Sequence, residues 1–270
     1  TIEDGSLKLS DELDKVDVEF QNVRFRYNES DPYVLNDINF SIRSGEKILI
    51  VGENGSGKTT LVKLLLRLYD VDGGTIKVNG DNIKDYSVED YRSLFATMFQ
   101  DYKLFALSVK DNILMTDRST AQNPDVEKAL EQVGIMDKIN QCSEGVESII
   151  SHEYTDDGVE FSVGEQQKLA LARMLSKHGK IFVLDEPSSS LDPIAEHQIF
   201  ELVCKECKEQ TVIFISHRMS SALLADRIFY LEKGRIEEIG TFEELMGLKG
   251  KFYKMFKCQS EKYNDDEEDI

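Results

Sequence analysis

The chain begins with alternating hydrophobic and polar positions and then passes into short, fully apolar runs. Residues 17–27 read DVEFQNVRFRY, with Val18, Phe20, Val23 and Phe25 apolar, which is typical of a strand with one buried face. After the turn residues NESDP, the segment VLNDINFSI predicts a second strand. EKILIVG then predicts a short buried strand that runs directly into glycines.

The rest of the chain alternates between helical and strand-like patterns. TTLVKLLLRLYD predicts a helix and GGTIKVNG a strand, whereas residues 100–177 are mostly helical and more polar. KIFVLDEP and TVIFISH are further apolar strands, and RIFYLEKGRIEEIG predicts a hairpin joined at Lys233 and Gly234. Strands alternating with helices indicate an α/β fold, a mostly parallel sheet covered on both faces and interrupted by a helical insertion.

Composition and charge narrow the classes of protein. Of 270 residues, 40% are hydrophobic, enough for one large domain or two small ones. The formal net charge of −19 argues against a nucleic-acid partner, because phosphate backbones require a basic surface. Part of the negative charge lies in residues 260–270, SEKYNDDEEDI, which we expect to be a solvated, disordered tail.

Cysteine spacing and apolar run length bear on metal binding and on location. Cys204 and Cys207 have the C-x2-C spacing of a zinc site, but no second pair follows at a suitable distance. The surrounding residues read as helix, so reduced thiols one turn apart are the better interpretation. No apolar run approaches the ~20 residues that span a bilayer, and no signal-peptide pattern is present. We therefore expect a soluble chain that is a piece of something longer.

A phosphate-binding loop is the most specific motif. Residues 52–59, GENGSGKT, fit the Walker A pattern G-x-x-x-x-G-K-[ST] between a predicted strand and a predicted helix. Glycines let the backbone wrap around phosphate, and successive N–H groups form an anion site at a helix N-terminus. Lys58 is predicted to reach the terminal phosphates, and Thr59 to coordinate Mg²⁺. The predicted nucleotide-binding residues of this segment are Gly52, Glu53, Asn54, Gly55, Ser56, Gly57, Lys58, Thr59 and Thr60.

Polar residues at two later strand ends complete the predicted site. Asp185 ends the apolar strand in IFVLDEP, where it can hold the Mg²⁺ shell, and Glu186 can polarise a water molecule. An Asp-Glu pair alone is weak support, since acidic pairs are common on surfaces. His217 closes TVIFISH, and its position at a third strand end beside the phosphates favours a functional role over an ordinary surface histidine.

In this order, these residues resemble the nucleotide-binding domain of an ATP-binding cassette (ABC) transporter, over residues 16–255. The resemblance implies that Tyr27 stacks on adenine, although a tyrosine on an edge strand is the alternative. It implies that Gln100 contacts Mg²⁺ and links the site to the membrane domains, and that Ser190, Leu191 and Asp192 form the D-loop, with Asp192 among the nucleotide-binding residues.

The resemblance also implies the architecture. We expect a P-loop NTPase (RecA-like) core with a mostly parallel sheet, an N-terminal antiparallel β subdomain and an inserted α-helical subdomain. DGGTIKVNG, SVKDNI and GTFEELM resemble exporters, and TDDGVEFSVGEQQKLALARM is most similar to bacterial peptide or bacteriocin exporters. The predicted parts are a linker from a transmembrane domain (1–14), an ATPase domain (15–256) with core and β subdomain (15–99 and 178–256) and helical subdomain (100–177), and an acidic tail (257–270).

The signature motif of the family is altered. Where the family has L-S-G-G-Q, this chain has FSVGE, residues 161–165. Ser162 and Glu165 predict a capping box, with Val163 at the first helical position, where a branched residue is tolerated at modest cost. The family places this helix start, including Ser162, Gly164 and Glu165, against ATP held by the opposite protomer. We interpret the signature as adjusted rather than lost, with an asymmetric pair of sites as the alternative.

The function expected from the sequence is ATP binding and hydrolysis that drives an exporter through ATP-dependent dimerisation. Glu186, His217 and Lys58 are the predicted catalytic residues, and Thr59, Gln100 and Asp185 are the predicted Mg²⁺ ligands. The expected partners are a second nucleotide-binding domain, identical or different, and transmembrane domains at the cytoplasmic face of the membrane. The alternatives are a weakly hydrolysing cassette in an asymmetric heterodimer, a cassette ATPase of chromosome maintenance or translation, and a scaffold.

Overall fold

The structure is a computed structural model that describes residues 2–9, 13–115, 125–151, 158–187, 193–219 and 221–268. Its strands are β1 (Val18–Phe25), β2 (Leu35–Ile42), β3 (Lys47–Val51), β4 (Gly73–Val78), β5 (Asp81–Asn82), β6 (Phe95–Met98), β7 (Ile181–Asp185), β8 (Thr211–Ser216), β9 (Arg227–Glu232) and β10 (Arg235–Gly240). Its α-helices are α1 (Lys58–Leu65), α2 (Val88–Ser93), α3 (Val109–Leu114), α4 (Val126–Gln132), α5 (Met136–Asn140), α6 (Val163–Leu175), α7 (Pro193–Glu206), α8 (Phe242–Leu248) and α9 (Lys251–Glu268).

The strands form two sheets. An antiparallel sheet has the order β2-β1-β4-β5, and a second sheet has the order β10-β9-β3-β8-β7-β6. In the second sheet β9, β3, β8, β7 and β6 pair in parallel, and β10 joins β9 antiparallel as the predicted hairpin. The predicted α/β class, the early antiparallel strands and the mostly parallel sheet are confirmed.

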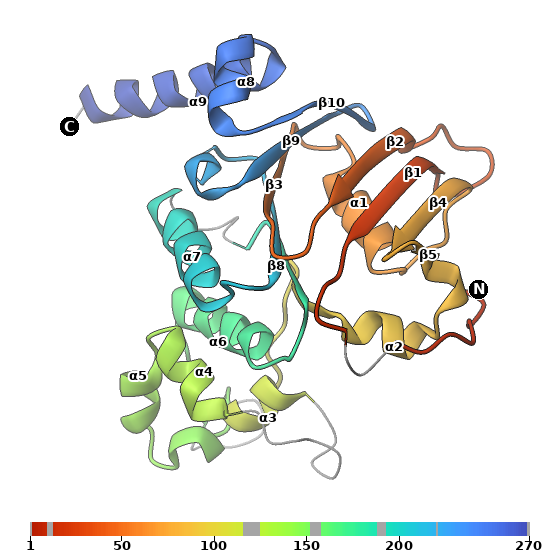
Figure 1. Cartoon of the computed structure of the whole chain (residues 1–270). Coiled ribbons are helices and arrows are strands. Elements are labelled where there is room, and N and C mark those ends of the chain that lie inside the picture. Colours follow the sequence, from red (N-terminus) through yellow and green to blue (C-terminus); the bar gives the residue numbers. More distant parts are fainter. Residues whose placement is uncertain are drawn as a thin grey trace.

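Both faces of the parallel sheet are covered, as the continuous apolar strands predict. In β3, Leu49 and Val51 face the cluster that includes α6 and α7, whereas Ile48 and Ile50 face the cluster that includes α1 and the antiparallel sheet. Figure 1 shows α6 and α7 on one side of β3 and β8, with α1, β1 and β2 on the other. The parallel sheet therefore lies between two packed layers.

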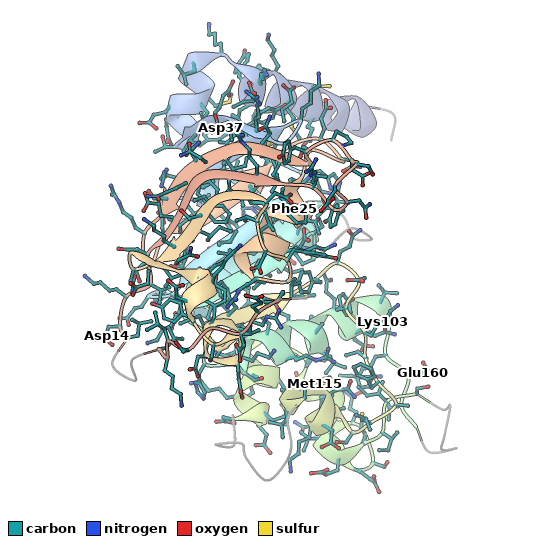
Figure 2. All side chains as sticks on the ribbon, turned by 90° about the vertical axis from the view of Figure 1, so that its right-hand side faces the viewer. Asp14, Phe25, Asp37, Lys103, Met115 and Glu160 are labelled. Carbon is teal, nitrogen blue, oxygen red and sulfur yellow. The ribbon has the colours of Figure 1, made fainter. Side chains whose placement is uncertain are left out.

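The helices α3, α4 and α5 lie together at one end of the molecule, and α8 and α9 lie at the opposite end (Figure 1). Figure 2 shows the molecule from the side, with Lys103, Met115 and Glu160 on the helical part and Asp37 on β2 of the antiparallel sheet. Between residues 100 and 177 the regular elements that the structure describes are all helical, α3, α4, α5 and α6 and one short 3-10 turn, which agrees with the type of element predicted there. In the described residues, no helix is both long enough and apolar enough to cross a membrane.

Two predicted elements end elsewhere in the structure. Helix α1 stops at Leu65 rather than continuing to Asp70, because Arg67 adopts a φ of 50°, outside the right-handed helical region. The prediction of a disordered tail is wrong as far as Glu268, since α9 runs from Lys251 to that residue. Its first turn is fixed on the core, and extending a nucleated helix costs little compared with starting one.

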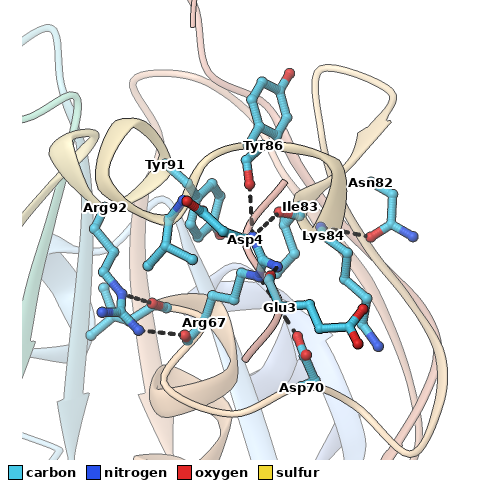
Figure 3. A network of polar contacts seen from close by, with 12 residues as sticks. Glu3, Asp4, Arg67, Asp70, Asn82, Ile83, Lys84, Tyr86, Tyr91 and Arg92 are labelled. Atoms are coloured by element: carbon cyan, nitrogen blue, oxygen red, sulfur yellow. Dashed lines mark hydrogen bonds and ion pairs between the residues drawn. The ribbon is translucent and has the colours of Figure 1, made fainter. Parts of the chain in front are cut away.

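The N-terminal segment packs against the turn between β5 and α2 (Figure 3). Leu7 N–H donates to Asp85 O at 2.8 Å, and Asp4 accepts from the Val88 N–H at 2.7 Å. The buried Arg67 guanidinium donates to Ile83 O, Tyr86 O and Glu3 O at 3.0, 2.8 and 2.5 Å. One side chain thus ties the end of α1 to both segments.

Candidate nucleotide-binding site

The phosphate loop joins β3 to α1, and its glycines are required by its geometry. Gly52 has a φ of 155°, and a Cβ there would lie 2.0 Å from Leu231 O. Gly57, the N-cap of α1, has a φ of 107°, and a Cβ there would lie 2.8 Å from Leu35 Cδ2. No L side chain fits either position without displacing a neighbour, so the loop is held tightly against β9 and β2.

A pocket of about 400 Å³ lies at the start of α1 and is formed by residues from four parts of the chain, one of them Val34, directly before β2. The loop and α1 contribute one wall, Gln100 follows β6, and Glu186 follows β7. The predicted residues therefore meet at the carboxyl ends of parallel strands, where open α/β sheets bind ligands. The lining residues are Val34, Asn54, Gly55, Gly57, Lys58, Thr59, Thr60, Gln100 and Glu186.

Lys58 is buried beneath the loop. Its ammonium donates to Gly52 O at 2.9 Å and Glu53 O at 3.1 Å, and lies 3.7 Å from Glu186 Oε1. Burial lowers the pKa of Lys58, and the carboxylates of Glu186 and Asp185 oppose that effect. The ammonium therefore holds the loop closed while remaining next to the carboxylate at the end of β7.

Asp185 has the properties of a cation ligand. It is buried at the end of β7. Burial raises the pKa of Asp185, and the neighbouring Thr59 side chain and the charge of Lys58 oppose that effect. Among the residues that the structure describes, Asp185 Oδ1 has no hydrogen-bond partner. A buried, unsatisfied carboxylate oxygen beside a threonine hydroxyl fits the oxygen ligands that Mg²⁺ prefers.

Glu186 lies between a lysine and a histidine. Its Oε1 atom is 3.5 Å from His217 Nδ1 as well as 3.7 Å from Lys58 Nζ, and the side chain is 15% exposed. The His217 contact is the main cause that lowers the pKa of Glu186, with Lys58 adding to it and burial opposing it. The backbone has a φ of 46°, unusual for glutamate, and its N–H donates to Ile215 O at 3.0 Å. Strained backbone held by a neighbouring strand is common at functional sites.

Tyr27 reaches the same region from the end of β1. Its hydroxyl lies 3.0 Å from Thr60 Oγ1, and 42% of the residue is exposed. Phe25 and Tyr69 contact its ring edge-on or nearly so, at centroid distances of 5.0 and 5.3 Å. Sequence reasoning missed Tyr69 and Val34, since both become neighbours of the site only after the sheets pack. Tyr69 was placed inside the predicted helix 59–70, which hid its position beside Tyr27.

The altered signature forms a well-capped helix start. Ser162 N–H donates to Glu165 Oε2 at 2.8 Å, and Glu165 N–H donates to Ser162 Oγ at 3.4 Å, so the predicted capping box is confirmed. The Ser162 N–H is also the main cause that lowers the pKa of Glu165. Val163 is the first residue of α6, as predicted, and is 57% exposed. Its isopropyl group faces solvent.

The structure does not bring the signature residues to the phosphate loop of the same chain. Ser162, Gly164 and Glu165 line a different pocket, of about 590 Å³, between α6 and α7. The predicted D-loop residues Ser190, Leu191 and Asp192 lie outside the described residues.

The fold and site together define a P-loop nucleotide-binding domain. Comparison with protein families matches residues 35–189 to the ABC transporter family, more than half of the chain. The chain therefore belongs to the ABC transporter family and is an ATP-binding domain, and the predicted family is confirmed.

Two relatives and a solved structure show the extent of this similarity. The chain is 39% identical to the subtilin transport ATP-binding protein SpaT of Bacillus subtilis, over 85% of this chain and 37% of the relative. It is 37% identical to an ATP-dependent lipid A-core flippase of Alkalilimnicola ehrlichii, over 90% of this chain and 40% of the relative. A bacterial Atm1-family ABC exporter with ATP bound has a TM-score of 0.82 at 29% identity, over 96% of this chain and 44% of that one. The chain thus spans well under half the length of these proteins.

Proposed function

We propose that ATP hydrolysis by this domain powers the export of a substrate, a peptide, across a membrane. The observation that carries this proposal is the position of Glu186, whose carboxylate lines the pocket of the phosphate loop 3.5 Å from His217 and 3.7 Å from Lys58. A carboxylate with a lowered pKa is ionised at neutral pH, as an activator of the attacking water must be.

The other residues have complementary roles in this proposal. Lys58 and the loop N–H groups stabilise negative charge on the β- and γ-phosphates, and His217 holds the γ-phosphate. Tyr27 stacks on adenine, at the edge of the pocket where its hydroxyl contacts Thr60. Asp185, Thr59 and Gln100 would hold Mg²⁺, which neutralises phosphate charge when bound.

The proposed partners are a second nucleotide-binding domain and transmembrane domains. Ser162, Gly164 and Glu165 line a pocket apart from the phosphate loop, which is consistent with a role toward ATP held by a partner. SpaT is by name a transport ATP-binding protein, and both relatives are more than twice as long as the matched region. We therefore place this domain at the cytoplasmic face of a membrane, as part of a longer exporter with a linker at its N-terminus.

A weakly hydrolysing cassette is the second candidate, and the exposed Val163 favours it. Its isopropyl group stands at the helix start that would face the partner's ATP. Against it, Glu165 is bonded back to Ser162, so its carboxylate is engaged with its own helix. The first candidate, a domain that hydrolyses ATP, accounts for more of the residues in the site than a weakly hydrolysing cassette does.

The test is steady-state ATPase activity of this chain over a range of protein concentrations. We expect specific activity to rise with concentration, because two domains must meet, and to vanish in Glu186→Gln. Glu19→Gln, which removes an exposed carboxylate on β1, is the matched control and should leave activity unchanged. Activity that survives in Glu186→Gln would refute the role of Glu186.

Background activity with retained ATP binding would favour the second candidate or a missing, different partner. Val163→Gly separates these outcomes in the same assay. Recovered activity would identify the signature as the cause, whereas unchanged background activity would indicate that another protein supplies the second half of the site.

A further inference from the structure

The backbone that carries His217 is held by a side chain from the C-terminal helix. Gln259 Nε2 donates to His217 O at 2.6 Å, and the Met219 N–H donates to Gln259 Oε1 at 3.1 Å. One carboxamide thus engages an acceptor and a donor two residues apart, and its orientation is fixed because exchanging its oxygen and nitrogen would break both bonds. Residues 217–219 follow β8 and have no regular secondary structure, so they depend on such bonds for a defined conformation.

Helix α9 presents Gln259 from a rigid base. Glu238 on β10 accepts from the N–H groups of Lys251 and Phe252 at 2.5 and 3.0 Å, which caps the first turn. Phe252 is fully buried, and Met255 and Phe256 pack against the same core. These residues and Gln259 are spaced three or four apart, so they share one face of the helix. The glutamine therefore continues an anchored apolar face, and its carboxamide reaches the backbone that follows β8.

The other flank of the same segment is fixed separately. The Ser216 hydroxyl is hydrogen bonded to Glu196 of α7, and the Arg218 N–H donates to Ser216 Oγ at 2.8 Å. Residues 216 and 218 are thus tied to α7, and residues 217 and 219 to α9. The imidazole of His217 leaves this doubly held backbone and meets Glu186 Oε1 at 3.5 Å.

We propose that Gln259 is a positioning residue for ATP hydrolysis, which sets the imidazole of His217 by holding its backbone. This inference rests on the role proposed above for His217. Because a histidine side chain is short, displacement of its carbonyl moves the ring relative to Glu186 and to the phosphate pocket. A misplacement of about 1 Å at a reacting group can cost up to about a hundredfold in rate.

The test compares Gln259→Met, which keeps the length of the side chain and removes both hydrogen bonds, with Lys257→Met. Lys257 is exposed on the same turn of α9, so it controls for the helix itself. Gln259→Glu is a second variant, which keeps an acceptor for the Met219 N–H and loses the donor to His217 O. Thermal unfolding of each variant checks that it is folded.

We expect Gln259→Met to lower kcat about tenfold with the KM for ATP within about twofold, since orientation and not binding is lost. The NMR signals of the His217 imidazole, assigned with His217→Ala, should shift in Gln259→Met and stay in place in Lys257→Met. In a His217→Ala background, adding Gln259→Met should cost almost nothing further, because both act through one ring.

Unmoved imidazole signals, or a kcat loss that persists in full without His217, would overturn the proposal. The two levels of failure are distinguishable. Wild-type kcat in His217→Ala would remove the role proposed for His217 and the inference with it. A lowered kcat in His217→Ala together with a wild-type kcat in Gln259→Met would overturn only the positioning role proposed for Gln259. If the wild-type chain hydrolyses ATP only at background level, kcat cannot be compared, and the shift of the His217 imidazole signals in Gln259→Met alone decides whether Gln259 positions the ring.

Discussion

At the scale of single residues, the site depends on two carboxylates: one is ionised, and the other has a buried oxygen with no hydrogen-bond partner among the described residues. Glu186 and Asp185 are adjacent in sequence, yet their pKa values move in opposite directions. Burial dominates at Asp185, whereas the neighbouring His217 dominates at Glu186. Asp185 is the last residue of β7, whereas Glu186 follows it with a φ of 46°, so the two carboxylates leave the chain from different backbone conformations and meet different environments.

The lowered pKa of Glu186 predicts the acid limb of the pH profile. A depressed pKa keeps the carboxylate ionised as pH falls, so the acid limb of kcat should lie below the ordinary range of glutamate, near 4.3. Removing the main cause with His217→Ala should raise the pKa and move the acid limb to higher pH, whatever the absolute rate. An acid limb at the same pH in both proteins would show that His217 does not set the ionisation of Glu186.

The capping box predicts a stability effect at the signature. Ser162→Ala removes the acceptor for the Glu165 N–H and should lower the free energy of unfolding by about 1 kcal/mol. Glu165→Gln keeps an oxygen for the Ser162 N–H and should be close to neutral. Urea denaturation measures both, and a large loss in Glu165→Gln would mean that the charge, rather than the hydrogen bond, stabilises the helix start.

At the scale of elements, the end of α1 and the N-terminal segment form one unit. Arg67 is 1% exposed, and its guanidinium serves carbonyls of Glu3, Ile83 and Tyr86 (Figure 3). Asp70 adds an ion pair at 3.6 Å. Since α1 begins at the phosphate loop, the proposed linker to a membrane domain contacts the far end of the helix that starts at the nucleotide.

Arg67→Met should release the N-terminal segment. Three carbonyls lose a charged donor, so we expect a loss of about 3 kcal/mol in stability and faster proteolytic cleavage within residues 2–9. Arg92→Met is the matched control, because Arg92 donates to Leu66 O and Arg67 O and, among the described residues, has no bond to residues 2–9. Equal cleavage rates in the two variants would show that the segment is not held by Arg67.

The sequence was sufficient where local pattern and motif coincide. The strands before Lys58, Asp185 and His217 are continuous apolar runs. Asp185 and His217 stand at strand ends and Lys58 follows a strand through the Walker A loop, so their convergence could be predicted. Gln259 could not, because the acidic composition of the tail suggested disorder, and only the packing of Phe252 reveals α9 as an anchored helix. A contact between two segments that are far apart in the sequence leaves no recognisable pattern in the residues around either of them.

At the scale of the whole molecule, the net charge of −19 opposes the association that the proposed function requires. Two identical chains repel, and the screening length falls from about 30 Å at 0.01 M salt to about 8 Å at 0.15 M. With Glu186→Gln holding ATP unhydrolysed, sedimentation should show the dimer fraction rising with ionic strength between these limits. Hydrolysis by the wild-type chain should rise in parallel at fixed protein concentration. A dimer that weakens with salt would instead require opposite charges across the interface, and then a partner of different, more basic sequence would be the better match for this chain.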